Sequence, residues 1–182
     1  LAFTKPFKGI ATMNVSDAIR SKRAVREFST QPLPPEVVRA ILNAGRRSQS
    51  SKNTQPWHFI ALQERAGLAA LSKLGTWAGH LAGAALGVAI LTPYPDLKFQ
   101  PQFDAGQAAA YMQLAAWDLG VGSCLASIYE GDKARELLGF PADWQLQTAL
   151  SFGYPLDPAK LTQPNKKGGR RPLDEIVHWE RW

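Results

Sequence analysis

Two dense groups of cationic side chains are the part of this sequence that could do chemistry. Four of the seven residues at positions 20–26 are Lys or Arg, and a second group lies at residues 166–171. Cations held close together repel one another unless an anion neutralises them. The formal net charge of +6 would suit nucleic acid, an anionic membrane surface or a phosphate-bearing ligand. Two compact groups so far apart in sequence favour one converging anion site over a continuous DNA-binding stripe.

Three other segments also have the composition of a ligand site. Residues 50–57 form a polar stretch that leads into an apolar one, Ser-Ser-Lys-Asn-Thr-Gln-Pro-Trp. Residues 120–124, Gly-Val-Gly-Ser-Cys, make a turn whose glycines can bring backbone N–H groups close to a ligand. Residues 170–173, Arg-Arg-Pro-Leu, repeat the positive charge near the end of the chain. With residues 20–28, these segments are the candidate site.

Common catalytic signatures are missing from the sequence. It has no G-x-x-x-x-G-K-[ST] phosphate loop, no G-x-G-x-x-G after a strand, and no G-x-S-x-G around a serine. His58, His80 and His178 have no metal-ligand spacing, so we expect a surface or structural role for each and no metal. The single cysteine, Cys124, lies in an apolar stretch and is expected to be a small core residue. With one cysteine no internal disulfide is possible, which fits a cytoplasmic protein.

The elements that position these segments alternate between helix and strand. Residues 1–13 have no period and are expected to form an arm, and nothing there resembles a signal peptide. Helical patterns begin at Asn14 or Ser16 and at Pro35, and Asp104 is a plausible cap for an Ala-rich helix that ends at Gly120. Other helices are predicted at residues 66–74 and 132–138, and extended segments at 57–62, 84–92, 121–128 and 146–154. Because βαβ units do not alternate cleanly, the pattern predicts a single α+β domain, residues 1–182.

In this order and at these separations, the four candidate segments resemble the FMN-dependent nitroreductase family. Residues 22–28 are similar to that family's Arg-Arg-Ser-Val-Arg-x-Phe, and residues 50–57 to its Ser-x-x-Asn-x-Gln-Pro-Trp. The Gly-x-Gly-Ser-Cys turn after a long helix, the Gly153-Tyr154-Pro155 step and the closing Arg-x-Pro-Leu also match. The resemblance extends from about residue 17 to residue 182, and it depends on the combination of motifs.

The resemblance implies a central mixed, mainly antiparallel sheet flanked by helices, in an intertwined homodimer with two FMN molecules at the subunit interface. The extended tail, residues 155–182, would pack on the partner subunit. By the same resemblance, the residues that bind the cofactor are Lys22, Arg23, Ala24, Arg26, Ser50, Asn53, Gln55, Gly122, Ser123, Lys167 and Arg170. The resemblance implies neither nucleic acid nor a membrane as a partner.

Each group in that set has an implied role. Lys22, Arg23 and Arg170 would hold the phosphate, with Lys167 as a weaker candidate. Arg26 would reach the ribityl and pyrimidine side of the flavin. Ser50 and Asn53 would contact the cofactor from the other subunit, and the backbone of Gly122 and Ser123 would approach the ring system near N5.

The implied reaction is a ping-pong transfer. NADH or NADPH would reduce the flavin, and a flat, electron-poor acceptor such as a nitroaromatic compound or a quinone would then take the electrons. Because the flavin carries this chemistry, no catalytic side chain is expected.

The sequence departs from the family pattern in three places. Ala24 stands where members usually have Ser, so a side-chain hydroxyl contact is lost while a backbone contact is retained. Lys22 replaces an Arg and keeps a point charge without the bidentate fork. The segment that often covers the active site is expected to be abbreviated between Leu91 and Asp104, leaving the flavin face more open.

Two alternative functions remain open from the sequence. Flavin-cleaving and reductive-dehalogenating members of the same family would share the FMN site and differ in its cover. From a different class, the chain could be a basic nucleic-acid-binding module that uses the two cationic groups, although it has no recognition-helix or stacking-platform motif.

Overall fold

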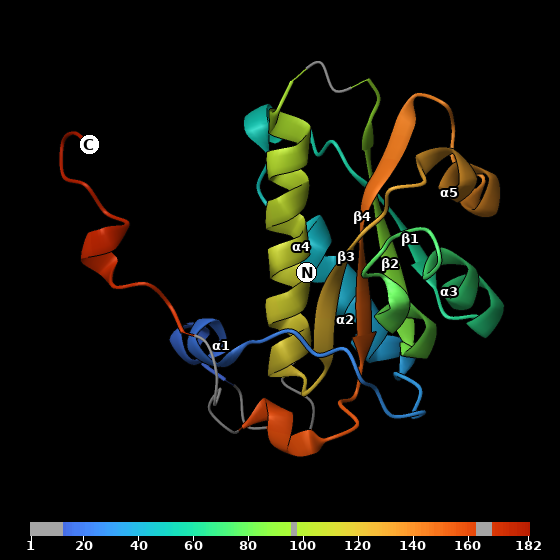
Figure 1. Cartoon of the computed structure of the whole chain (residues 1–182), viewed down its shortest axis with the longest axis horizontal. Coiled ribbons are helices and arrows are strands. Elements are labelled where there is room, and N and C mark those ends of the chain that lie inside the picture. Colours follow the sequence, from blue (N-terminus) through green and yellow to red (C-terminus); the bar gives the residue numbers. More distant parts are fainter. Residues whose placement is uncertain (1–12, 96–97, 163–168) are drawn as a thin grey trace.

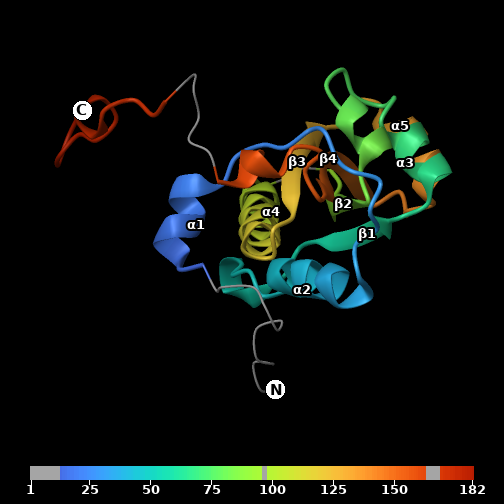
Figure 2. The same ribbon diagram turned by 90° about the horizontal axis from the view of Figure 1, so that it is seen from below.

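A four-stranded antiparallel sheet lies between two layers of helices. The computed structural model describes residues 13–95, 98–162 and 169–182. The strands are β1 (His58–Leu62), β2 (Leu86–Pro93), β3 (Gly122–Ser127) and β4 (Trp144–Gly153), in the order β1-β2-β4-β3. Figure 1 shows the long helix α4 (Gln100–Asp118) running beside the sheet, and Figure 2 shows α2 (Pro35–Arg46) next to it on the same side. The predicted α+β class is confirmed, and the sheet strands are all antiparallel in the described residues.

The remaining helices cover the other face of the sheet or lie outside it. α3 (Arg65–Leu71), α5 (Gly131–Leu138) and the short 3-10 helix η2 (Gly79–Gly83) cover that face, whereas α1 (Val15–Ser21) lies against the end of α4. The other 3-10 turns are η1 (Ser51–Asn53), η3 (Pro158–Leu161) and η4 (Leu173–Glu175). Together these elements form three layers, with the sheet in the middle.

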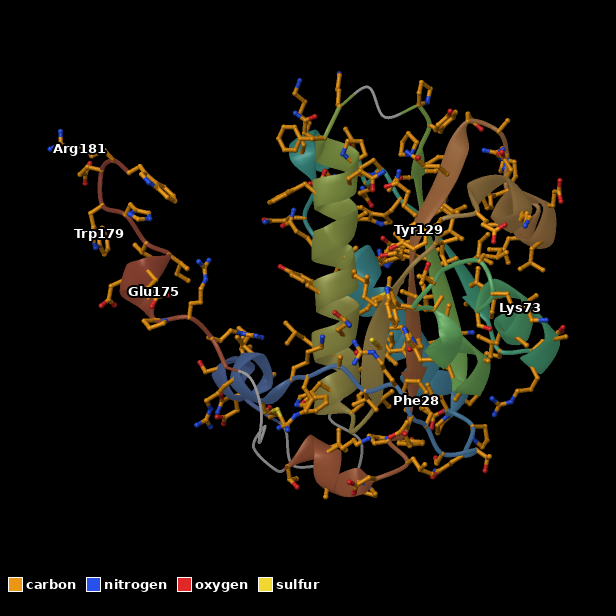
Figure 3. All side chains as sticks on the ribbon, viewed as in Figure 1. Phe28, Lys73, Tyr129, Glu175, Trp179 and Arg181 are labelled. Atoms are coloured by element: carbon orange, nitrogen blue, oxygen red, sulfur yellow. The ribbon has the colours of Figure 1, made fainter. Side chains whose placement is uncertain are left out.

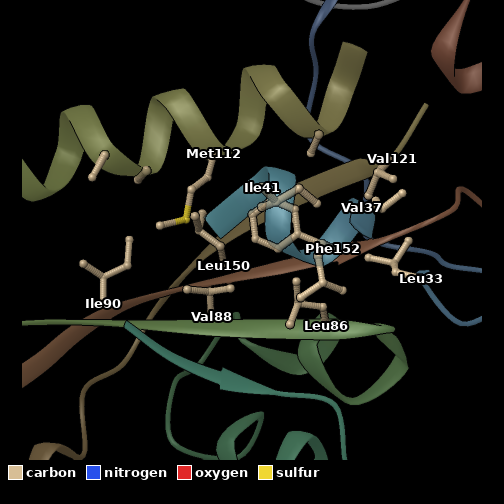
Figure 4. Packing of buried hydrophobic residues seen from close by; sticks show 14 of the residues in the cluster. Leu33, Val37, Ile41, Leu86, Val88, Ile90, Met112, Val121, Leu150 and Phe152 are labelled. Atoms are coloured by element: carbon tan, nitrogen blue, oxygen red, sulfur yellow. The ribbon is translucent and has the colours of Figure 1, made fainter. Parts of the chain in front are cut away.

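Two hydrophobic cores follow from the alternation of side chains along β2. Val88 and Ile90 point to the layer of α2 and α4, where Ile41, Met112 and Phe152 complete the packing (Figure 4). Ala89 and Leu91 point to the opposite face and pack in the core that also holds side chains of α3 and η2. A strand buried on both faces reads as a continuous apolar run, and this explains the sequence of residues 86–91.

The Ala-rich helix begins earlier than expected. α4 starts at Gln100, so residues 100–103 are helical and Asp104 is not a cap: Asp104 lies one turn inside the helix and is buried. The buried face of α4 is formed by small and medium side chains, including Ala105, Ala108 and Met112. Tyr111 is 44% exposed and does not belong to that face. A polar residue at position 104 was mistaken for a start signal because its tertiary partner could not be known.

The ends of the other helices agree more closely with the sequence. The side chain of Asn14 caps α1 by accepting a hydrogen bond from the N–H of Asp17, and Pro35 opens α2. Gly120 and Gly139 adopt left-handed backbone conformations where α4 and α5 end. The sequence placed these boundaries because they depend on local chemistry.

The last residues extend away from the body of the molecule (Figures 1 and 2). Leu173, Ile176, Trp179 and Trp182 are all exposed in this segment. In the part of the chain that is described, no helix combines the length and the apolar character needed to cross a membrane.

Candidate functional site

A pair of glycines seats the cationic segment, residues 22–28, on the sheet. Gly122 of β3 and Gly153 of β4 are partners in register. A Cβ on Gly122 would lie 2.7 Å from the Val25 side chain, and one on Gly153 would lie 2.9 Å from the Phe28 ring. The sheet therefore accepts the segment only because both positions lack a side chain. Phe28 lies at this end of the sheet in Figure 3.

Backbone hydrogen bonds hold the same segment in place. Ala24 forms an isolated parallel bridge with Ser123, and the Val25 N–H donates to the Ser123 carbonyl at 2.9 Å. At the other end, the Leu156 N–H donates to the carbonyl of Glu27 at 3.0 Å. Val25 is buried while Ala24 and Arg26 on either side of it are exposed, so the packing fixes the direction in which the cations point.

The two cationic groups come together in space. Burial, and the positive charge of Arg170 to a smaller extent, lower the pKa of Lys22, while Cys124 acts in the opposite direction. The pKa of the Cys124 thiol is raised by burial, against the effects of Arg26 and Lys22. Lys22 therefore lies near Arg170, and Lys22 and Arg26 both lie near Cys124; within the described residues none of the three cations forms a salt bridge. Such a cluster has positive charge available for an anion.

The outer edge of β3 contacts other segments at both ends, and the His80 ring hydrogen-bonds the Leu125 backbone between them. The cationic segment covers its start at Ser123. Near its end, a Cβ on Gly75 would lie 2.0 Å from the Ser127 carbonyl oxygen, and the Tyr129 N–H donates to the Leu74 carbonyl at 2.8 Å. Between these contacts Leu125 is 49% exposed. The exposed Leu125 side chain offers an apolar surface for a planar group beside the cations.

The polar loop, residues 50–55, has an unusual backbone. Lys52, Asn53 and Gln55 have φ values of 52°, 55° and 48°, which non-glycine residues seldom adopt. The Ser50 hydroxyl accepts from the Gln55 N–H at 2.9 Å and closes the loop on itself. Such conformations persist where the surroundings enforce them, and they often mark binding sites.

Asp104 anchors the polar loop to α4. Its buried carboxylate accepts a hydrogen bond from the Ser51 N–H at 2.9 Å. The cationic segment lies near the other end of the same helix, where Trp117 Nε1 donates to the Ser21 hydroxyl at 2.9 Å. Thirteen residues of helix separate Asp104 from Trp117, a rise of about 20 Å. The two predicted halves of the site are therefore far apart within one chain.

The structure divides the predicted site residues into three sets. Near the start of β3 it brings together Lys22, Arg23, Ala24, Arg26, Gly122, Ser123 and Arg170. Ser50, Asn53 and Gln55 lie at the distant end of α4, and Lys167 lies outside the described residues. Ser123 is fully buried and its carbonyl already pairs with Val25, so its approach to a ligand stays a prediction.

Sequence reasoning missed His80 as a neighbour of this site. A hollow of about 580 Å³ is lined by Arg26, Thr76, Trp77, Gly79 and His80. Burial first and Arg26 second lower the pKa of His80, while a hydrogen bond to the Leu125 backbone raises it. No motif surrounds His80, so only the fold could place it here.

A larger hollow, about 740 Å³, lies beyond the end of β3. Tyr94, Ser127, Tyr129 and Arg135 are among the residues that line it, and it includes none of the predicted site residues. Tyr129 is labelled in Figure 3. Size alone therefore does not identify the site. Within the described residues, no three His, Cys, Asp or Glu side chains are arranged to hold a metal ion.

The connection between β2 and α4, where a shortened cover is expected, is brief. β2 ends at Pro93 and α4 begins at Gln100. Residues 98 and 99, the last two before α4, are not part of a helix or strand. Little chain is thus available between these elements to fold over the site.

Comparison with known proteins connects this arrangement to one family. The Nitroreductase family model matches residues 19–80 and 75–154. A protein of Archaeoglobus fulgidus, whose name combines NADH dehydrogenase and NAD(P)H nitroreductase, is 29% identical over 174 residues, covering 90% of this chain and 96% of that protein. A chloronitrobenzene nitroreductase of Comamonas testosteroni is 44% identical over a shorter stretch of 48 residues, or 26% of this chain and 21% of that protein.

Solved structures share the fold over most of their length. An FMN-dependent nitroreductase of Clostridium difficile superposes with a TM-score of 0.78 at 25% identity, covering 91% of this chain and 98% of that one. The NADPH:FMN oxidoreductase of Vibrio harveyi, solved with NAD⁺, has a TM-score of 0.80 at 21% identity over 92% of this chain and 77% of its own. The second likeness concerns the fold alone.

Proposed function

The chain belongs to the nitroreductase family, and from that premise we propose that it is an FMN-dependent oxidoreductase. In this proposal NADH or NADPH supplies electrons, and a nitroaromatic compound, a quinone or a similar electron-poor acceptor receives them by a ping-pong mechanism. The observation that carries the proposal is that the cationic segment packs on the start of β3, where Lys22 and Arg26 both lie near Cys124 and Lys22 also lies near Arg170.

The residues present fit FMN in charge and in shape. The phosphate of FMN is an anion, and Lys22 and Arg170, which form no salt bridge within the described residues, are suited to bind it. The hollow that Arg26 lines gives a flat ring a place beside this side chain. When bound, FMN supplies the hydride chemistry, and the protein binds and orients it.

Different side chains then bind the phosphate and the ring. Lys22, Arg23 and Arg170 hold the phosphate, and each charge-assisted contact is worth about 1.5–3 kcal/mol. Arg26 lies on the ring side, in the hollow near His80, where its positive charge stabilises electron density that the ring gains. Ala24 contributes its backbone only, because its side chain is a methyl group.

We further propose that the active form is a homodimer in which each site takes its cations from one subunit and its polar loop from the other. The separation of about 20 Å along α4 supports this, because one chain cannot easily bring both halves to the same ring. The exposed apolar side chains of residues 173–182 support a tail that packs on the partner (Figure 3). The single cysteine supports a cytoplasmic location.

The first experiment tests for the cofactor. The protein is purified, saturated with FMN and examined by visible absorption, then mixed anaerobically with NADH or NADPH. We expect a yellow protein with one FMN per subunit that bleaches on reduction and regains colour with a nitroaromatic compound or a quinone. A protein that takes up no FMN would overturn the proposal. Consumption of FMN during aerobic turnover would favour the flavin-cleaving alternative.

The second experiment tests the shared site. Subunits with Arg26→Gln and subunits with Asn53→Ala are each expected to be poorly active as homodimers. Refolded together, they form mixed dimers in which one site is intact, so activity should recover to about a quarter of the wild-type value. Mixing Arg26→Gln with Lys22→Gln subunits is the matched control, because both changes affect the same half. Equal recovery in both mixtures, or none in either, would contradict a site built from two subunits.

A further inference from the structure

The larger hollow, of about 740 Å³, takes no part in the proposed reaction. It lies between the start of α5 and the first half of β4, and Tyr94, Tyr129, Asp132 and Arg135 are among the residues that line it. Small-molecule sites combine flat apolar side chains with a few well-placed polar groups. This lining contains both kinds of side chain, and its arginine is the most informative of them.

The Arg135 guanidinium is held in place at the hollow. Its central carbon lies over the Phe140 ring, 5.5 Å from the ring centre, and Phe140 is buried. Nη2 also donates a long hydrogen bond, 3.4 Å, to the Trp144 carbonyl oxygen. Packing on a buried ring restricts the rotation of a long side chain. A ligand that binds this guanidinium therefore loses less of the entropy cost of ordering it.

The same guanidinium has few partners for its charge. Within the described residues its one salt bridge is with Asp132, which accepts from Nη1 at 3.0 Å and whose side chain is 95% exposed. An ion pair this exposed contributes little, because water competes for both groups. Nε of Arg135 is buried and has no hydrogen-bond partner in the described ranges. The side chain, which is 31% exposed, can therefore gain by exchanging Asp132 for a better anionic partner.

Two tyrosine rings line the same hollow. Tyr94 is 54% exposed and Tyr129, labelled in Figure 3, is 65% exposed. Their backbones are fixed, because the Tyr94 N–H donates to the Asp143 carbonyl and the Tyr129 N–H to the Leu74 carbonyl, each at 2.8 Å. A single exposed aromatic side chain is ordinary on a protein surface. Two of them beside a positioned arginine are suited to hold a flat ring.

We propose that this hollow is a second ligand site, which binds a planar aromatic molecule carrying one carboxylate. The carboxylate takes the place of Asp132 on the Arg135 guanidinium, and the aromatic ring lies against Tyr94 and Tyr129. A carboxylate matches the fork of donors that a guanidinium presents, and one negative charge matches one arginine.

The charges around the hollow favour a monoanion over a phosphate. Asp132 lies beside Arg135 and would repel a dianion strongly. Lys133, the neighbouring cation on α5, is already paired with Glu130. The cationic segment, which suits a phosphate, contributes no residue to this hollow. The site therefore does not depend on a bound flavin, and the proposal goes beyond the proposed function.

The test compares 2-naphthoate with 2-naphthamide, which has the same ring and nearly the same shape but no charge. Binding of each is measured by isothermal titration calorimetry at pH 7 with saturating FMN present. We expect wild type to prefer naphthoate by about 5- to 10-fold. Arg135→Gln should remove the preference. Arg39→Gln, which removes an exposed charge on α2, and Arg26→Gln, which removes one from the cationic segment, should both retain it.

Two further variants distinguish ligand binding from a structural role of Arg135. Asp132→Asn removes the competing carboxylate, so naphthoate affinity should rise about threefold while naphthamide affinity stays the same. Tyr129→Ala should weaken both ligands by a similar factor, because contact between rings does not depend on the carboxylate. Thermal unfolding checks that each variant is folded. If Arg135→Gln does not fold, the gain in Asp132→Asn decides the question.

Four results would overturn the proposal. They are no measurable binding of either ligand, equal affinities of wild type for the two ligands, a preference that survives in folded Arg135→Gln or disappears in Arg26→Gln, and an Asp132→Asn variant with no gain for naphthoate. None of these results bears on FMN binding, which the absorption spectrum measures separately.

Discussion

The cationic segment and the polar loop are built in different ways. Residues 22–28 owe their position to absent side chains, because Val25 and Phe28 fill the spaces above Gly122 and Gly153. Residues 50–55 owe theirs to positive φ angles and to one buried carboxylate, Asp104. The first region is fixed by close packing and the second by hydrogen bonding. They lie at opposite ends of α4, so a change in one should leave the other intact.

The largest effect is expected from Gly122→Ala. The new Cβ would lie 2.7 Å from Val25, so the cationic segment must shift. The shift moves several cations away from FMN, and the loss of their charge-assisted contacts should weaken FMN binding by more than about 100-fold. Gly106→Ala is the control, since its Cβ meets nothing within 4 Å. Equal FMN dissociation constants for the two variants would show that the glycine does not seat the segment.

A smaller loss is expected from Asp104→Ala, which releases the polar loop without touching the cations. The Ser51 N–H loses its buried acceptor, so FMN affinity should fall about tenfold. Trypsin should also cleave faster after Lys52, a readout that needs no cofactor. Asp104→Asn keeps an acceptor oxygen and should restore part of both properties. Unchanged cleavage at Lys52 would mean that the loop keeps its conformation without the hydrogen bond to Asp104.

Arg170→Gln should show whether Arg170 contacts the phosphate or the ring of the cofactor. Arg170 is exposed, so the loss should be modest, about fivefold in FMN affinity. Riboflavin binding should not change, because riboflavin has no phosphate. The Lys22 amine should titrate at higher pH in this variant, because a repelling charge is gone. Equal losses for FMN and riboflavin would place Arg170 at the ring instead.

The smallest effect concerns Cys124, which lies between Lys22 and Arg26. Burial raises the pKa of its thiol despite both cations, so the thiol stays protonated at neutral pH. Iodoacetamide should therefore react more slowly than with a free thiol, and the rate should rise only as the pH exceeds the ordinary thiol range. Mass spectrometry across pH values measures this. Rapid alkylation at pH 7 would show that the cations, and not burial, control the group.

Short-range chemistry made much of the fold predictable. Asn14 and Pro35 mark helix starts, Gly120 and Gly139 mark helix ends, and the apolar run at residues 86–91 identifies a doubly buried strand. Asp104 was misassigned because a polar residue near a helix start usually caps it, whereas here it accepts from Ser51, 53 positions away in the sequence.

By itself the sequence determined the family, the α+β class, the order of the elements and the residue types available to bind an anion, because these depend on local patterns and motif spacing. Only the tertiary structure decided which of those residues meet. It joined Lys22 to Arg170, separated both from Ser50 and Asn53, and set His80 beside Arg26. The physical reason is that long-range packing, here of Val25 on Gly122, leaves no signal in either residue alone.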